Sequence, residues 1–184
     1  MSQKNIEIKA RCNNISVVID YLDKNPLFVK QGLDHQTDTY YNTINGTRLK
    51  MREGNVENAL VSYKRDNQLG PKNSDIVLHH FGIDYSSVKT IDNLKDILNH
   101  SLGTLVVVNK YRHIYWNDKD NVKIHVDEVD NLGNFVEIEV MDFTGNRDKL
   151  EMQELCEFYI DQFTLHHGLI SNSYSDLLLK NDKL

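Results

Sequence analysis

Charged side chains recur at every second position along several segments of this chain. Side chains at i, i+2 and i+4 lie on the same face of a β-strand, so each segment predicts a strand with one charged face and one apolar face. The segment from Ile6 to Arg11 shows this pattern, with charges at 7, 9 and 11 and apolar residues at 6, 8 and 10. The charged positions are Glu7, Lys9, Arg11, Arg48, Lys50, Arg52, Lys64, Lys110, Arg112, Lys123, His125, Asp127, Glu137 and Glu139.

The charges are also sorted by sign: cations occupy 48–52, 64 and 110–112, whereas carboxylates occupy 137 and 139. Lys and Arg bind phosphate oxygens through charge-assisted hydrogen bonds. Nine Lys and Arg in one shared interior would repel one another strongly unless an anion such as a polyphosphate lies between them. Carboxylates there would repel that phosphate unless Mg²⁺ or Mn²⁺, which prefers oxygen ligands, bridges the two. The pattern favours a site for a metal–triphosphate complex; the alternative interpretation is a sheet with one solvated face.

Periodicity and turn residues predict the elements that position these side chains. Turn signals such as Asn45-Gly46 and Gly54-Asn55 imply antiparallel hairpins. We expect strands at 3–12, 36–42, 47–54, 58–66, 74–83, 104–116, 120–129 and 134–142. Amphipathic helices are expected at 15–24, 91–101 and 147–167, and a short helix near Ser173, to cover the apolar outer face. The predicted fold is α+β: a closed eight-stranded antiparallel β-barrel with flanking amphipathic helices in a single domain, 1–184.

Composition excludes several classes of protein. The chain has 184 residues, a net charge of −6 and a pI of about 5.7, so its surface should not attract nucleic acid broadly. It has no run of 18 apolar residues and no apolar core of a signal peptide near Met1, so we expect no membrane span. Cys12 and Cys156 form no metal or disulfide pattern, which favours a cytoplasmic location.

Several blocks, in order along the chain, resemble the CYTH family, also called triphosphate tunnel metalloenzymes. They are 5–11 (NIEIKAR), 35–41 (HQTDTYY), 48–52 (RLKMR), 110–112 (KYR), 122–129 (VKIHVDEV), 132–139 (LGNFVEIE) and 173–178 (SYSDLL). The resemblance implies a tunnel, a divalent metal and a triphosphate substrate.

The resemblance also implies roles for individual residues. The expected metal ligands are Glu7, Glu137, Glu139 and Asp127, the last directly or through water. The expected phosphate-binding residues are Lys9, Arg11, Arg48, Lys50, Arg52, Lys64, Lys110, Arg112, Lys123 and His125. Lys9, Asp127 and Glu137 are expected to act in catalysis. For His125, proton transfer and a structural hydrogen bond remain alternatives.

One position departs from the family pattern, since Asn5 stands where the N-terminal signature usually has its first Glu. Asn keeps an oxygen ligand and loses a charge, so a second metal site should be weakened or missing. The resemblance is closest to the class IV adenylyl cyclase branch, which also suggests a homodimer. A triphosphatase, and a module that binds nucleotide or polyphosphate without turnover, are the alternatives.

Overall fold

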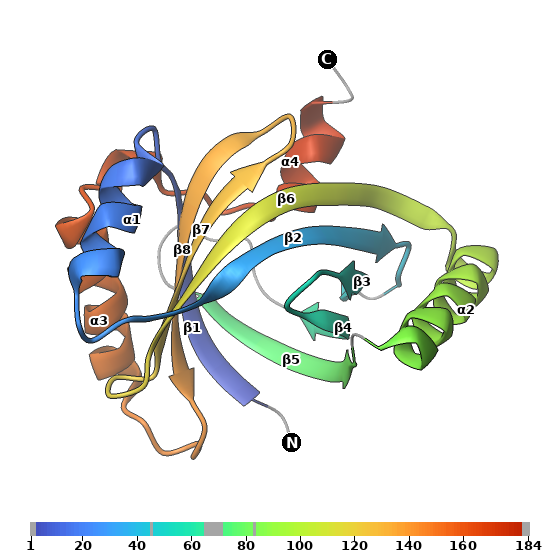
Figure 1. Ribbon diagram of the computed structural model, residues 1–184, viewed down its shortest axis with the longest axis horizontal. Helices are drawn as coiled ribbons and strands as arrows, with labels where there is room; N and C mark the ends of the chain where they lie inside the picture. The colour runs from blue at the N-terminus through green and yellow to red at the C-terminus, as the bar shows by residue number, and fades with distance from the viewer. Residues whose placement is uncertain (1–2, 45, 65–71, 83, 182–184) are drawn as a thin grey trace.

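The computed structural model describes residues 3–44, 46–64, 72–82 and 84–181 (Figure 1). Eight strands lie in these ranges: β1 (Gln3–Arg11), β2 (Val29–Tyr41), β3 (Arg48–Glu53), β4 (Asn58–Lys64), β5 (Lys72–Phe81), β6 (Thr104–Asn117), β7 (Val122–Val129) and β8 (Gly133–Asp142). The helices in the same ranges are α1 (Ile15–Lys24), α2 (Tyr85–Leu102), α3 (Lys149–Gln162) and α4 (Tyr174–Asn181), with a 3₁₀ turn, η1 (His166–Gly168).

The strands form one antiparallel sheet that curls around a hollow interior (Figure 1). Their order is β1-β5-β4-β3-β2-β6-β7-β8, and β8 pairs back with β1, which makes a barrel. The β1–β8 pairing runs from Lys4 to Arg11, whereas the β1–β5 pairing spans only Gln3 to Glu7. The α+β class and the curled eight-stranded antiparallel sheet are as the sequence predicts.

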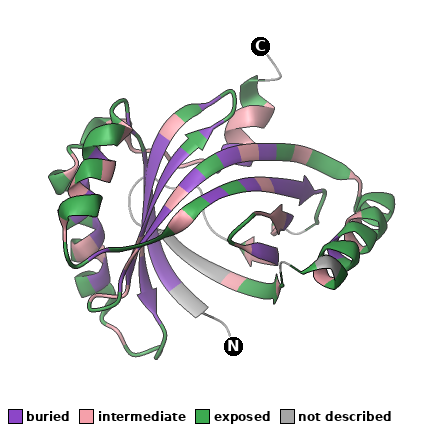
Figure 2. Ribbon diagram, viewed as in Figure 1, coloured by how far each residue is buried: buried purple, intermediate pink, exposed green. Residues whose placement is uncertain are grey.

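The apolar outer face of β1, β7 and β8 forms the main hydrophobic core. Ile8, Ile124 and Ile138 are fully buried there. Helices α1 and α3 cover this face, and they contribute Leu22 and Ile160 to the same core (Figure 2). Burial of these side chains holds the sheet's other face, which carries the charges, toward the interior.

Two smaller helices cover the rest of the barrel. Ile91 of α2 packs with Tyr41 and Met51 on the outer face of β2 and β3. Tyr174 of α4 packs against Phe135 of β8, with ring centroids 4.9 Å apart. No described helix is both long and apolar enough to cross a membrane.

The predicted start of β2 is wrong, because the strand begins at Val29 rather than at 36. Residues 29–35 show no clean alternation of polar and apolar residues, and Gly32 lies among them. The pairing with β6 extends the strand: it runs from Val29–Trp116 to Tyr41–Thr104, with an irregularity between Lys30 and Gly32. A neighbouring strand thus determines what the local pattern does not show.

Two predicted helix boundaries are also wrong. Helix α2 begins at Tyr85 rather than at 91, because the Asp84 carboxylate accepts hydrogen bonds from two backbone N–H groups of its first turn. Helix α3 spans Lys149–Gln162 rather than 147–167, and Asp148 caps its start in the same way. The predicted ends of two strands, at 65–66 and 83, lie outside the described residues.

Candidate functional site

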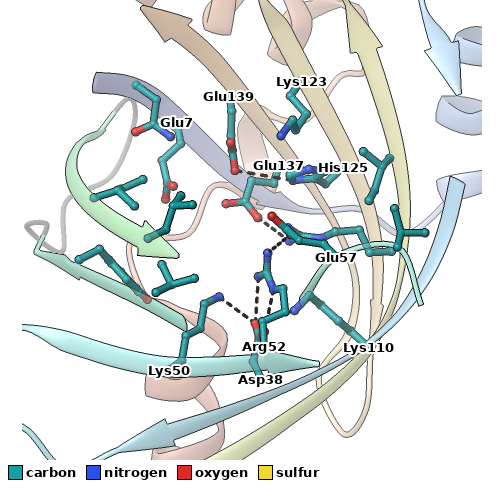
Figure 3. Close-up of a pocket in the computed structure, with 18 of the residues that line it drawn as sticks. Glu7, Asp38, Lys50, Arg52, Glu57, Lys110, Lys123, His125, Glu137 and Glu139 are labelled. Carbon is teal, nitrogen blue, oxygen red and sulfur yellow. Dashed lines mark hydrogen bonds and ion pairs between the residues drawn. The ribbon is translucent and has the colours of Figure 1, made fainter. Parts of the chain in front are cut away.

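A cavity of about 650 Å³ lies inside the curled sheet, and all eight strands contribute to its lining (Figure 3). Its charged side chains are Lys9, Lys50, Arg52, Lys110, Arg112 and Lys123, with Glu7, Asp38, Glu57, Glu137 and Glu139. Lys9 and Lys110 are only 4% and 1% exposed. The charged faces therefore point inward, and the alternative of a solvated face is wrong for these strands.

Three cations on one side of the cavity surround the buried carboxylate of Asp38 on β2. The ammonium groups of Lys50 and Lys110 each lie 2.8 Å from Asp38 Oδ2, and Arg52 Nε donates to Asp38 Oδ1 at 2.8 Å (Figure 3). Arg52 also donates to Glu57 at 2.7 Å. We call Asp38, Lys50, Arg52 and Lys110 the cation cluster.

Burial raises the pKa of Asp38, but the charges of Arg52, Lys110 and Lys50 hold it well below its usual range. Burial lowers the pKa of Lys110 to about 7; Asp38 opposes this effect, whereas Arg52 and other nearby cations reinforce it. The cluster therefore carries a carboxylate that stays ionised and a lysine that titrates near neutral pH.

Glu7, Glu137, Glu139 and His125 form an acidic cluster on the β1–β8–β7 side of the cavity (Figure 3). The strand register places Glu7 directly opposite Glu139, and His125 opposite Glu137. One ligand atom from each of His125, Glu137 and Glu139 lies within 4.8 Å of the others. Burial and the neighbouring Glu137 raise the pKa of Glu139. Burial, followed by the charge of Arg112, holds the pKa of His125 well below its usual range.

Arg112 connects the acidic cluster to the barrel wall through Asp127. Its Nε donates to Asp127 Oδ1 at 2.7 Å, and its Nη2 contacts Asp127 Oδ2 at 2.6 Å and Glu137 Oε2 at 2.9 Å. The Tyr174 hydroxyl of α4 donates to Asp127 Oδ2 at 2.7 Å. Asp127 is fully buried and does not line the cavity. The structure thus places Asp127 behind the site, where both its oxygens are occupied.

Three predicted phosphate-binding residues do not line the cavity. Arg11 is exposed at the end of β1, and its Nη1 donates to Leu132 O at 2.7 Å. Arg48 pairs with Asp176 of α4 at 2.9 Å. Lys64 is exposed, because its neighbour Tyr63 faces the cavity and alternate residues of a strand face opposite sides.

The cations do not depend on an external anion, so that part of the sequence argument is wrong. Asp38, Glu57, Asp127 and Glu137 already pair with four of the six cations that line the cavity, namely Lys50, Arg52, Lys110 and Arg112. Lys9 also lies 3.4 Å from Glu137. A bound polyanion would join an ion-pair network that is already nearly balanced in charge.

Sequence reasoning missed Asp38 and Glu57 as residues of the site. A signal for Asp38 exists, because Asp34, Gln36 and Asp38 form a polar alternation, and all three are buried. Glu57 precedes β4 in a turn, where no periodicity operates. Asp34 holds that turn, because its carboxylate accepts hydrogen bonds from the backbone N–H groups of Val56 and Glu57.

The inward face of β4 and β5 differs from the other walls because it is mainly apolar. Val61, Tyr63, Ile76 and Leu78 line the cavity there. Val61 lies opposite Leu78 in the register, and Tyr63 lies opposite Ile76. We call these four residues the apolar wall. Since Val61 also lies opposite Lys50, the apolar wall adjoins the cation cluster.

The chain resembles known proteins in sequence pattern and in fold. A family model described as the CYTH domain matches residues 3–158. No curated protein matches the chain. A Vibrio parahaemolyticus structure described as a "putative adenylate cyclase" is similar with a TM-score of 0.74 at 19% identity, covering 97% of this chain and 99% of that one. The PH1012 protein of Pyrococcus horikoshii OT3 is similar with a TM-score of 0.71 at 19% identity, covering 94% and 98%. A conserved hypothetical protein of Pyrococcus furiosus gives 0.72 at 20% identity, covering 94% and 99%.

Proposed function

This chain belongs to the CYTH domain family, and we propose that it is a divalent-metal-dependent enzyme that converts ATP to 3′,5′-cyclic AMP and pyrophosphate, as class IV adenylyl cyclases do. One observation carries the proposal: the cavity places buried Lys50, Arg52 and Lys110 on one side and the carboxylates Glu7, Glu137 and Glu139 on another (Figure 3). Cations that bind phosphate and carboxylates that bind metal are thus separated within one enclosed space.

The acidic cluster fits a divalent cation. Glu7 and Glu139 are direct cross-strand partners, and like charges in that position destabilise a sheet. A divalent ion would neutralise them, and carboxylate oxygens are ligands that Mg²⁺ and Mn²⁺ accept. Glu7, Glu137 and Glu139 would hold the ion, and Asp127 would orient Arg112 instead of binding metal. When bound, such an ion acts as a Lewis acid toward phosphate oxygens.

The cation cluster would bind and orient the triphosphate. Each lysine ammonium has three donors, and Asp38 engages one ammonium of Lys50 and one of Lys110, which leaves further donors for phosphate oxygens. Asp38 fixes both side chains before substrate arrives, and such preorganised charge is what phosphoryl and nucleotidyl transfer require of the protein. Lys123 lies on β7 beside the acidic cluster (Figure 3) and would contact the same phosphate chain.

The apolar wall supports an organic triphosphate over inorganic tripolyphosphate. A tripolyphosphate has no surface that gains from contact with Val61, Ile76 or Leu78, whereas a nucleoside does. The name of the Vibrio relative supports the cyclase reaction, in which the ribose 3′-hydroxyl attacks the α-phosphorus and pyrophosphate leaves. A triphosphatase would use the same charged residues with water as the nucleophile, so products must decide between the two reactions.

The test is to incubate the purified protein with ATP, GTP, thiamine triphosphate or tripolyphosphate, with Mg²⁺ or Mn²⁺, and to separate the products by chromatography. Cyclic AMP with pyrophosphate is the expected result. Orthophosphate from several substrates would replace the cyclase with a triphosphatase, and tight binding without any product would indicate a binding module. Glu139→Gln should abolish turnover and keep the fold; full activity in this variant would overturn the metal-site assignment.

A further inference from the structure

We propose that His125 is a metal ligand through its Nδ1 atom, so that the centre in this cavity combines an imidazole with carboxylates and prefers a transition-metal dication to Mg²⁺. This inference rests on the proposed function only for the location of the metal. It adds a ligand and a metal preference for which the resemblance to the family gives no role, since the resemblance implies phosphate binding for His125.

The first observation is that His125 is a buried polar group without a partner. Its side chain lines the cavity and the residue is 5% exposed. Among the described residues, no hydrogen-bond partner lies in reach of its buried Nδ1. Leaving such an atom unsatisfied is unfavourable by about 1–3 kcal/mol, and an ion is one of the few explanations for such an atom in a native protein.

The second observation is the position of the neighbouring donors. His125 Nδ1 lies 3.6 Å from Glu139 Oε1, and donors from His125, Glu137 and Glu139 all lie within 4.8 Å of one another. Two ligands of one ion, each about 2.1 Å from it, are roughly 3 Å apart at a right angle and about 4.2 Å apart on opposite sides. The observed separation of 3.6 Å falls in this interval, so the three side chains can reach one ion with little movement.

The third observation concerns the surroundings of the ring. The register places His125 opposite Glu137 on β8, and Lys50, Arg52 and Lys110 belong to the cation cluster around Asp38. A ring that donates to phosphate would be expected beside those cations. A ring beside carboxylates that repel each other is better placed to bind the cation that they require.

An imidazole ligand changes which ion the centre selects. Mg²⁺ demands oxygen ligands in nearly ideal octahedral geometry, whereas imidazole suits transition metals. With His125 in the ligand set, Mn²⁺ should bind more tightly than Mg²⁺. If only Glu7, Glu137 and Glu139 bound the ion, the discrimination would be small.

The inference is tested on the protein without nucleotide, with Mn²⁺ as the probe. Electron spin-echo envelope modulation of the Mn²⁺ complex should show one directly coordinated nitrogen, and ¹⁵N-histidine labelling should change that signal. His125→Ala should remove the signal and weaken Mn²⁺ binding by about 10- to 100-fold, while Mg²⁺ binding, measured by competition, changes by less than about threefold. His80→Ala is the matched control, because His80 also lines the cavity but is exposed and lies near Glu57; it should keep the signal and the affinity.

Bound Mn²⁺ without a nitrogen signal in the wild-type protein would overturn the inference, and that result does not depend on a variant that folds. Persistence of the signal in His125→Ala, or no Mn²⁺ binding at all, would also overturn it. If the signal is present but no triphosphate is converted, the proposed function fails and the assignment of His125 stands.

Discussion

Asp38 shows how a single residue organises half of the cavity. It is 2% exposed and contacts Lys50, Arg52 and Lys110. Three cations at such close range would otherwise repel one another in a region of low dielectric. Because Asp38 acts as their common counter-anion, the protein can hold a phosphate-binding cluster in place before any phosphate binds.

Asp38→Asn should lower the free energy of unfolding by about 3–5 kcal/mol, because removing one partner leaves buried charges uncompensated. Tripolyphosphate should stabilise this variant more than the wild type, since it supplies the missing negative charge. Urea unfolding with and without tripolyphosphate measures both effects. Asp34→Asn is the control: Asp34 is fully buried but accepts hydrogen bonds from Gln36 and backbone N–H groups, so its variant should gain nothing extra. Equal stabilisation of Asp38→Asn and the wild type would contradict this role.

Lys110 should make phosphate binding depend on pH near neutrality. Its pKa is lowered to about 7, so the side chain is charged below that pH and neutral above it. A bound anion favours the charged form, and the affinity must therefore fall as the pH rises through about 7. Lys110→Arg should remove this step because arginine stays protonated.

Calorimetric titration with tripolyphosphate between pH 6 and pH 9 measures the effect of Lys110. The ratio of the wild-type to the Lys110→Arg affinity cancels the titration of the ligand itself. A ratio that does not change with pH would show that Lys110 keeps its proton across the range.

At the scale of elements, β4 and β5 give the cavity a different surface from the other strands. Val61, Tyr63, Ile76 and Leu78 face inward, while Lys64 at the end of β4 is exposed. The strands of the cation cluster and of the acidic cluster present charges at the corresponding positions. This division suits a ligand with a charged part and an apolar part.

Leu78→Ala should weaken ATP binding by about tenfold, since burying a leucine side chain against a ligand contributes about 1.5–3 kcal/mol. Tripolyphosphate binding should stay unchanged, because this ligand has no apolar part. Val77→Ala, on the opposite face of the same strand and 70% exposed in the native chain, should alter neither. Titration calorimetry with both ligands compares the three proteins, and equal losses for ATP and tripolyphosphate would show that the apolar wall does not contact the nucleoside.

At the scale of the whole molecule, the two sides of the barrel are supported unequally. Helices α1 and α3 pack on β1, β7 and β8 and form the main core, whereas α2 covers β2 and β3 with a much smaller cluster (Figures 1 and 2). The metal-binding side thus lies on the firmer half of the molecule. The cation cluster reaches across to β3 on the other half.

Amide hydrogen exchange should reveal this asymmetry. Backbone amides of β7 and β8 should exchange more slowly than those of β3 and β4, because local opening is easier where fewer apolar contacts are lost. Tripolyphosphate should slow exchange in β3 most, since Lys50 and Arg52 would then be fixed to a ligand. Mass spectrometry of peptides before and after addition of tripolyphosphate gives the comparison, and uniform protection across the barrel would contradict it.

The sequence by itself determined the architecture and the direction of the charged faces. Alternation at 6–11 and 122–126 predicts strands with one apolar side, and the structure confirms that helices cover that side. The physical reason is local: the strand period of two fixes which residues share a face wherever the face is long enough to be read.

The tertiary structure decided which charges meet. Asp127, His125 and Lys123 have the same alternation in sequence, yet Asp127 is enclosed by Arg112 and Tyr174 while His125 and Lys123 line the cavity. The partners come from β6, α4 and β8, so only the register between strands and the docking of α4 fix them. Periodicity gives the face of each residue; long-range pairing gives its neighbours, and for this reason the counter-anion role of Asp38 and the apolar wall were not visible in the sequence.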